Sequence, residues 1–260
     1  MGSKGSQHIM NIDLSGKTAL VTGGSVGIGQ AIAIALADSG AQVAITYLSH
    51  NADAVMSAIR EHGKDALAIQ LDATDSAAVN AAAAHVAETF GGHIDILVNN
   101  AGGLVRRAEI AEMSDELWHQ ILEVNITTTF YCTRAVLPYM KNGWGRIINM
   151  GSVAGHHGGG IGAVAYATTK GAIHTLTRGL SKELAPRRIT VNALAPGYIE
   201  NTPFHIGTTP KNKEGMIAQS ALKRPGMPED VMGAALFLAS DLATFITGEV
   251  IEINGGSWFA

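Results

Sequence analysis

A tyrosine and a lysine stand four residues apart in Tyr166-Ala167-Thr168-Thr169-Lys170, and Ser152 precedes them in the chain. On a helix, residues at i and i+4 share one face, so the phenol and the ammonium group are neighbours. Such a pair suits proton transfer to or from a carbonyl or alcohol oxygen. The Tyr-x-x-x-Lys spacing is common by chance, and Ser152 alone also reads as a serine that starts a turn. Because Ser152 directly follows a candidate strand, Arg146–Met150, the combination favours a catalytic site.

The chemistry of this set depends on the acidity of the phenol. A free tyrosine has a pKa near 10, which is too high for an efficient base at neutral pH. A cation beside Tyr166 stabilises the tyrosinate, so Lys170, and any further positive charge bound close by, would lower that pKa. Lowering a pKa by one corresponds to about 1.4 kcal/mol. Interactions with nearby charges can supply a few times this energy, so they can lower the pKa of Tyr166 by a few.

A second constellation is the glycine-rich stretch Thr22–Gly29, which lies between a candidate strand and the helical run Gln30–Asp38. Glycines here let the backbone turn tightly and approach a pyrophosphate at the helix N-terminus. The unpaired N–H groups and the helix dipole stabilise that anion. An ordinary tight turn is the alternative interpretation, and the position between strand and helix favours a dinucleotide site.

The elements that must position these residues alternate between strand and helix along the whole chain. Several candidate strands are continuously apolar, as expected for strands covered on both faces. The pattern predicts an α/β fold, a single Rossmann-type doubly wound domain over residues 11–260, with an approximately seven-stranded parallel sheet and helices on both faces. Ligands of such sheets bind beyond the carboxyl ends of the strands, where the motifs fall. The predicted strands are Thr18–Thr22, Val43–Tyr47, Ala66–Leu71, Ile94–Asn99, Arg146–Met150, Thr190–Leu194 and Val250–Ile253.

Helical segments are expected between these strands. Ile173, Leu176, Leu180 and Leu184 form one apolar stripe after Tyr166, and Pro186 marks the end of that helix. A second long helical run is expected around Glu116–Tyr139.

Jointly the motifs resemble the short-chain dehydrogenase/reductase family over about Leu14 to Ala260. The resemblance rests on three residues between the key glycines Gly23 and Gly27, on Asn99-Asn100-Ala101-Gly102 after the fourth strand, and on Pro196-Gly197 after the sixth. Within the family, the chain is similar to the 3-oxoacyl-(acyl-carrier-protein) reductase-like branch. That similarity includes the ending with Thr247-Gly248-Glu249 and Asn254-Gly255-Gly256.

The resemblance implies a role for each catalytic residue. Tyr166 would be the general acid/base, Lys170 would lower its pKa and bind the nicotinamide ribose, and Ser152 would orient the carbonyl. Asn125 would hold a water that leads from the lysine to solvent. Asparagine is a poor residue for a helix interior, so a special role is plausible there, and a satisfied buried amide remains the alternative.

The resemblance also implies the cofactor-binding residues, with Asp72 contacting the adenine and the segment at Pro196 meeting the nicotinamide carboxamide. No metal ligands are expected. The expected cofactor-binding set is Gly23, Ser25, Val26, Gly27, Ile28, Gly29, Tyr47, Ser49, Asp72, Ala73, Asn99, Ala101, Gly102, Tyr166, Lys170, Pro196, Gly197, Ile199 and Thr202.

The choice between NAD and NADP depends on the end of the second strand. NAD-specific sites usually place an acid there, which bonds the ribose 2′-hydroxyl. Here that position is Tyr47, so a 2′-phosphate would meet no repulsion, and Ser49 can donate to it. The arginine of a committed NADP site is missing, since Val26 and Leu48 are apolar. We expect NADP(H) to be favoured over NAD(H).

The substrate pocket is expected between the segments Gly102–Arg107 and Gly155–Val164, with Glu200–Met216 as a mobile lid. The activity implied is an NAD(P)-dependent oxidoreductase acting on CH–OH donors, with a 3-oxoacyl-thioester-type substrate. A sugar or polyol dehydrogenase is the alternative, and a catalytically silent dinucleotide-sensing protein is a third possibility. Arg106 and Arg107 would suit an acidic carrier protein, although two surface arginines are ordinary.

Composition excludes several other classes. The net charge is −4 without any Lys/Arg run, so no nucleic-acid partner is expected. No apolar run approaches the roughly 20 residues that span a bilayer, so no membrane partner is expected. Cys132 is the only cysteine and lies in an apolar stretch, which predicts a buried thiol and a reducing, cytoplasmic setting.

Three further expectations complete the interpretation. Met1–Met10 reads as an expression leader and is set aside in the fold argument. The pair His156–His157 precedes a glycine run and is expected to be a solvated loop. The family resemblance implies a homotetramer, with the two long helices at the subunit interface.

Overall fold

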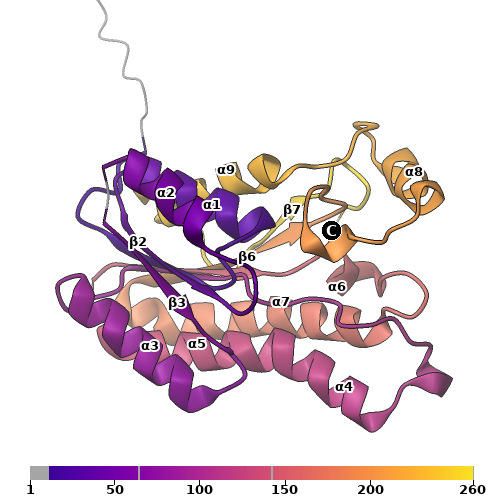
Figure 1. Ribbon diagram of the computed structural model, residues 1–260, viewed down its shortest axis with the longest axis horizontal. Helices are drawn as coiled ribbons and strands as arrows, with labels where there is room; N and C mark the ends of the chain where they lie inside the picture. Colours follow the sequence, from indigo (N-terminus) through magenta and orange to yellow (C-terminus); the bar gives the residue numbers. More distant parts are fainter. Residues whose placement is uncertain (1–11, 64, 142, 260) are drawn as a thin grey trace, which may run out of the picture.

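The computed structural model describes residues 12–63, 65–141 and 143–259, so the expected leader Met1–Met10 lies outside the described residues. One parallel sheet crosses the molecule with the strand order β3-β2-β1-β4-β5-β6-β7. Helices cover both faces of the sheet (Figure 1). This arrangement confirms the predicted doubly wound fold.

All seven strands form where the apolar runs predict them, with small differences at their ends. The largest difference is at β6, which continues through Ala195 to Pro196 because the whole segment is buried and pairs with β5 and β7. The strands are β1 (Thr18–Val21), β2 (Gln42–Tyr47), β3 (Ala66–Gln70), β4 (Ile96–Asn99), β5 (Gly145–Met150), β6 (Ile189–Pro196) and β7 (Val250–Ile253).

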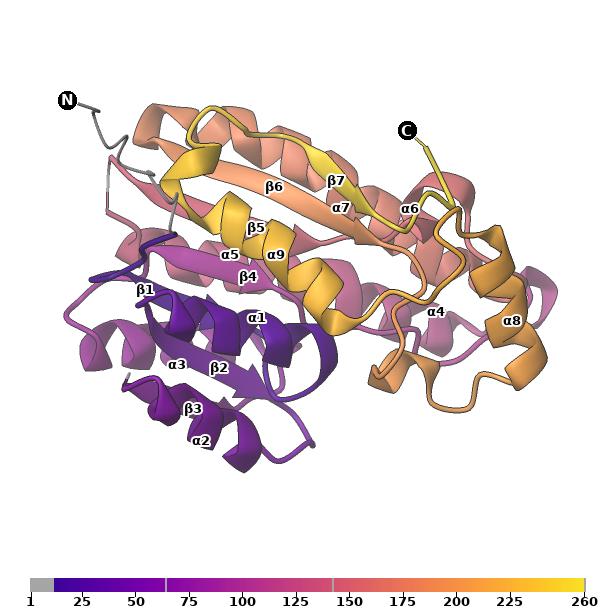
Figure 2. The same ribbon diagram turned by 90° about the horizontal axis from the view of Figure 1, so that it is seen from above.

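The helices form two layers around the sheet. One layer holds α1 (Gly27–Asp38), α2 (Asp53–Glu61) and α9 (Pro228–Ala239), and the other holds α3 (Ser76–Thr89), α5 (Thr128–Val136) and α7 (Val164–Leu184). The remaining helices are α4 (Asp115–Leu122), α6 (Ala154–His157) and α8 (Pro210–Gln219). Figure 2 shows α6 and α8 beyond the tips of the strands, at one end of the sheet. The chain order reverses between β1 and β4, which opens the crevice where such folds bind ligands.

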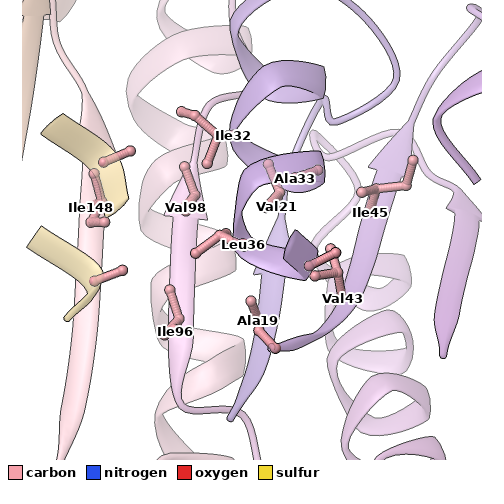
Figure 3. Close-up of a cluster of buried hydrophobic side chains, with 14 of the residues drawn as sticks. Ala19, Val21, Ile32, Ala33, Leu36, Val43, Ile45, Ile96, Val98 and Ile148 are labelled. Carbon is pink, nitrogen blue, oxygen red and sulfur yellow. The ribbon is translucent and has the colours of Figure 1, made fainter. Parts of the chain in front are cut away.

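Two apolar cores fix this framework, one on each face of the sheet. In Figure 3, Ile32 and Leu36 of α1 lie over Val98 of β4, and Ile45 of β2 belongs to the same cluster on the other side of α1. All four side chains are fully buried. On the opposite face, α3 and α5 pack against the sheet, and Cys132 of α5 lies in this second core. The thiol of Cys132 is buried as predicted, and burial raises its pKa to about 12. This cysteine is therefore a packing residue.

The long helix expected around Glu116–Tyr139 is interrupted. Between α4 and α5, residues Glu123–Thr127 form a π-helical turn, labelled η2. Single π turns of this kind occur most often at functional sites. Its central residue is Asn125, so the unfavourable helix residue noted in the sequence coincides with the irregularity.

The prediction for His156 and His157 was only partly right, because His157 is exposed as expected but neither residue lies in a loop and His156 is partly buried. Both residues lie in the short helix α6, and Nε2 of His156 is 2.7 Å from Oε1 of Glu252 in β7. The His156 ring also packs at a tilt against His174 of α7, with ring centroids 4.5 Å apart. The glycine run suggested a solvated loop, but the contact with Glu252 and the ring packing keep His156 partly buried.

No helix within the described residues is long and apolar enough to cross a membrane. This agrees with the absence of a long apolar run in the sequence.

Candidate active site

Ser152 and Tyr166 meet beyond the end of β5. β5 ends at Met150, so Ser152 stands at the carboxyl edge of the sheet, and Tyr166 lies in the first turn of α7. Tyr166 is buried, and burial raises its pKa to about 12, while a hydrogen bond with Ser152 acts in the lowering direction. The phenol is therefore protonated at neutral pH, the state needed to donate a proton to a reduced carbonyl oxygen.

Lys170 lies one turn further along α7, as the spacing predicts. Its Nζ is 5.5 Å from the centre of the Tyr166 ring and donates a hydrogen bond to the Met150 carbonyl at 2.8 Å. Burial lowers the pKa of this lysine to about 8. In the protein without cofactor, burial outweighs the hydrogen bond with Ser152 in setting the pKa of Tyr166, and the lowering by Lys170 and an oxidised nicotinamide stays a prediction. The tyrosinate needs a further positive charge, which an oxidised nicotinamide would supply.

Asn125 is fully buried in the π turn, and its amide is bonded within the protein. Nδ2 donates to the carbonyls of Gly103 at 2.8 Å and Ile121 at 2.9 Å, and Oδ1 accepts from the Gly103 amide at 3.1 Å. The side chain therefore ties the π turn to the loop after β4. This is the satisfied buried amide that the sequence left open, and the water relay stays a prediction.

The glycine loop has the geometry of an anion site. Gly23 and Gly27 have φ values of +61° and +58°, a region that side chains rarely adopt. The loop leads into α1, whose N-cap residue Val26 provides no side-chain hydrogen bond and whose first turn carries no acid. The first N–H groups of α1 therefore remain available to a phosphate. These residues fit the pyrophosphate of a dinucleotide.

Thr22 and Asn100 hold this loop in place, and the sequence prediction missed both as site residues. Nδ2 of Asn100 donates to the carbonyls of Thr22 at 3.0 Å and Gly23 at 2.9 Å. Oγ1 of Thr22 accepts from the amides of Asn100 and Ala101, each at 3.0 Å. The second asparagine of the Asn99-Asn100-Ala101-Gly102 motif was the available signal.

Asn99 has a different position from the one expected. Its side chain is buried, and Nδ2 donates to Oγ1 of Thr133 at 3.0 Å and to Oδ1 of Asn149 at 2.9 Å. These bonds link β4 to β5 and α5 beneath the site. Any contact of Asn99 with a cofactor must therefore come from its backbone.

The residues expected around the adenosine lie at the ends of β2 and β3. Tyr47 ends β2, and the following Leu48 and Ser49 are exposed. Asp72 follows β3 and is fixed by Thr74, whose hydroxyl and amide donate to Oδ1 at 2.7 and 2.9 Å. These bonds lower the pKa of Asp72. Of these four positions only Asp72 carries a charge, and Tyr47 leaves the end of β2 without an acid.

The segment after β6 covers the opening between the glycine loop and the catalytic residues. A side chain at Gly27 would meet Cγ2 of Thr202 at 3.3 Å, which shows how closely the two segments approach. Two residues further on, the ring of Phe204 lies against Tyr166, with centroids 5.2 Å apart. Pro196, Gly197, Ile199 and Thr202 thus lead from the end of β6 to the catalytic tyrosine, as expected for the nicotinamide end of a dinucleotide.

A doubly wound sheet with an uncapped glycine loop beside a serine, a tyrosine and a lysine defines a nicotinamide-dependent oxidoreductase. Comparison with known proteins makes this assignment more specific. Residues 23–257 match the family model described as enoyl-(acyl carrier protein) reductase. The chain belongs to the short-chain dehydrogenase/reductase family and is an NAD(P)-dependent oxidoreductase.

Curated relatives match the chain over almost its whole length. It is 44% identical to the 3-oxoacyl-(acyl-carrier-protein) reductase of Aquifex aeolicus, across 95% of this chain and 99% of that protein. The enzyme of the same name from Escherichia coli is 40% identical, with the same coverage of both chains.

Solved structures share the fold. A dehydrogenase/reductase from Sinorhizobium meliloti is 37% identical with a TM-score of 0.90, covering 95% of this chain and 97% of that one. A short-chain dehydrogenase from Burkholderia cenocepacia, solved in complex with NADP, is 37% identical with a TM-score of 0.88, covering 94% and 98%. A protein from Brucella melitensis titled a glucose/ribitol dehydrogenase is 34% identical with a TM-score of 0.87, covering 96% and 100%.

Proposed function

We propose that this protein reduces a 3-oxoacyl thioester to the 3-hydroxyacyl thioester. The observation that carries the proposal is the apolar wall beside the catalytic tyrosine. Tyr166 belongs to a cluster with Leu117 and Ile121, and the partly buried Leu104 and Phe204 pack against it. An acyl chain gains free energy by covering such apolar surface, whereas a polyol gains little. The similarity to two 3-oxoacyl-(acyl-carrier-protein) reductases supports the same substrate class.

The chain's own residues supply the proton and the orientation. A reduced nicotinamide, when bound, would supply hydride to the carbonyl carbon. Ser152 donates a hydrogen bond that holds the carbonyl oxygen beside Tyr166, and the phenol donates its proton to that oxygen to give the hydroxyl. Lys170 lies under the Tyr166 ring and leaves the Met150 carbonyl to bind the nicotinamide ribose. These roles are proposals that rest on the geometry and on the family motif.

NADPH is the proposed reductant. Tyr47 stands where an acid would bond the ribose of NAD, so nothing there repels a 2′-phosphate, and Ser49 is exposed beside it. The Burkholderia relative solved with NADP supports the preference. Fluorescence titration with NADPH and NADH tests it: tighter binding of NADPH is expected, and tighter binding of NADH would contradict it.

A substrate panel tests the proposed activity. Reduction of acetoacetyl thioesters with NADPH should exceed oxidation of ribitol, glucose and simple alcohols, when both are followed at the absorbance of the reduced nicotinamide. Efficient polyol oxidation without thioester reduction would favour the alternative, a sugar or polyol dehydrogenase, which is what the name of the Brucella relative indicates. Cofactor binding without turnover of any substrate would favour a dinucleotide sensor.

The proposed lid and assembly complete this account. We propose Glu200–Met216 as the lid, in which the ion pair of Lys213 with Glu200, 2.9 Å long, joins α8 to the end of β6. We also propose a homotetramer built on α5 and α7, where the half-exposed Phe130 supplies apolar surface, and a cytoplasmic location. Light scattering of the purified protein tests the assembly, and a monomer would contradict it.

A further inference from the structure

We propose that Arg107 binds the phosphate of a pantetheine-type carrier arm and so selects thioesters that carry one. This inference rests on the proposed reduction of 3-oxoacyl thioesters. It concerns the mouth of the site, outside the catalytic residues. We use the word mouth for the edge of the site at which three backbone segments gather. These are the loop after β4, the loop between α6 and α7, and the segment after β6, all at one end of the sheet (Figures 1 and 2).

Arg107 is held at this mouth by the neighbouring loop. Its Nη1 donates to the Ile161 carbonyl at 2.9 Å, and the next amide, of Ala108, donates to the Gly162 carbonyl at 3.0 Å. A side chain at Gly162 would lie 3.1 Å from Cβ of Arg107, so a glycine is needed there for the two loops to meet. The arginine is therefore positioned from two sides although it is exposed.

The backbone that presents Arg107 is strained. Val105 has a φ of +62°, and a β-branched residue in this region is a true outlier. The amide of Arg106 closes a tight turn onto the Leu104 carbonyl at 2.8 Å. Strain of this kind persists where the surroundings impose it, and it is concentrated at ligand-binding positions. On either side of this turn, Leu104 packs against the cluster that contains Tyr166 and Arg107 is bonded to Ile161.

The charge of Arg107 is not paired with a carboxylate in the part of the chain that the structure describes. Within residues 12–63, 65–141 and 143–259, no carboxylate forms an ion pair with it. Burial lowers the pKa of His205 to about 4, and the positive charges of Lys213 and Arg107 contribute to this decrease. An arginine that is positioned and uncompensated suits an anion, and its planar fork matches the oxygens of a phosphate.

The position of Arg107 relative to Tyr166 indicates which part of a substrate could reach the arginine. Phe204 lies against Tyr166, with ring centroids 5.2 Å apart, and His205 lies against Phe204, with centroids 5.0 Å apart. Arg107 is bonded to the Ile161 carbonyl, in the loop that leads into α7 and to Tyr166. A small alcohol held at Tyr166 would be too short to reach Arg107. A thioester on a long arm would continue past Phe204 and bring its phosphate to the arginine.

A matched pair of substrates isolates this contact. Acetoacetyl-phosphopantetheine and acetoacetyl-pantetheine differ only in the phosphate. For Arg107→Ala we expect kcat/KM to fall about tenfold with the phosphorylated thioester and to change less than about twofold with the other, since one charge-assisted contact is lost. Arg107→Lys should recover part of the loss. Arg106→Ala, which removes the adjacent exposed arginine, should leave both values near those of the unaltered protein.

Three results would overturn the proposal. Equal losses of kcat/KM with both thioesters in Arg107→Ala would mean that the arginine supports the loop and does not bind phosphate. A loss confined to substrates attached to a carrier protein would mean that it contacts the carrier surface. If the unaltered protein reduced both thioesters equally well, the proposed activity would stand and the phosphate contact would fall. Reduction of neither thioester would refute the proposed function itself.

Discussion

Replacing Asn125 with alanine distinguishes a structural role from a role in proton transfer. The substitution removes three hydrogen bonds, two from Nδ2 and one to Oδ1, and two of them fasten the loop at Gly103 to the π turn. At about 1 kcal/mol net for each bond, the free energy of unfolding should fall by about 3 kcal/mol. For a chain of this size, that loss lowers Tm by roughly 6–12 °C.

The assay for this variant is thermal unfolding followed by circular dichroism, with kcat measured well below the transition. Asn51→Ala is the matched control, since the same substitution at an exposed asparagine, bonded to Asp53, should cost under about 1 kcal/mol. An Asn125→Ala variant that unfolds within a degree of the unaltered protein, yet loses kcat, would refute the reasoning. The residue would then act in proton transfer and not as a tie between two segments.

Three other substitutions test the site. In Lys170→Met, the change in unfolding free energy relative to the unaltered protein should vary between about pH 8 and pH 10.5. The buried lysine has a folded pKa below its unfolded value, so the unaltered protein gains stability as pH rises through this window, and the variant should lack that gain in denaturant titrations. Tyr47→Asp should weaken NADPH binding at least about tenfold while sparing NADH, because a carboxylate repels the 2′-phosphate, and Tyr47→Asn should not. Gly27→Val should abolish dinucleotide binding, since φ is +58° there and the side chain would press on Thr202; unchanged affinity in a fluorescence titration would mean that the phosphate loop lies elsewhere.

The fold and the catalytic set were predictable because both depend on local pattern. Apolar runs such as those of β1 and β4 become strands covered on both faces, and the motifs then fall at one edge of the sheet. The spacing of Tyr166 and Lys170 needs only the period of a helix. The sequence therefore placed Ser152, Tyr166 and Lys170 correctly relative to the elements that carry them.

What the sequence left out depends on contacts between distant segments. The bond of Lys170 to the Met150 carbonyl and the burial of Tyr166, which raises the pKa of the phenol, do not follow from the spacing alone. His156 was placed in solvent because its partner, Glu252, lies on the last strand. Asn99 was predicted as a site residue and Asn100 was not, because the motif alone does not show which of the two side chains faces the glycine loop.

The π turn at Asn125 was only partly visible. An asparagine in a helical run signals an irregularity, but its nature depends on Gly103, which lies in another segment. In the same way, the contact of Phe204 with Tyr166 closes the pocket with a residue that no motif singles out.

The most direct test of the central claim is Tyr166→Phe, measured as kcat/KM for an acetoacetyl thioester with NADPH, alongside NADPH affinity. Phenylalanine fills the same buried volume and removes only the hydroxyl that bonds with Ser152. A lost general acid costs about 10²–10⁴-fold in rate, so we expect a loss in that range with NADPH affinity nearly unchanged. Activity within about twofold of the unaltered protein would contradict the assignment of Tyr166 as the proton donor.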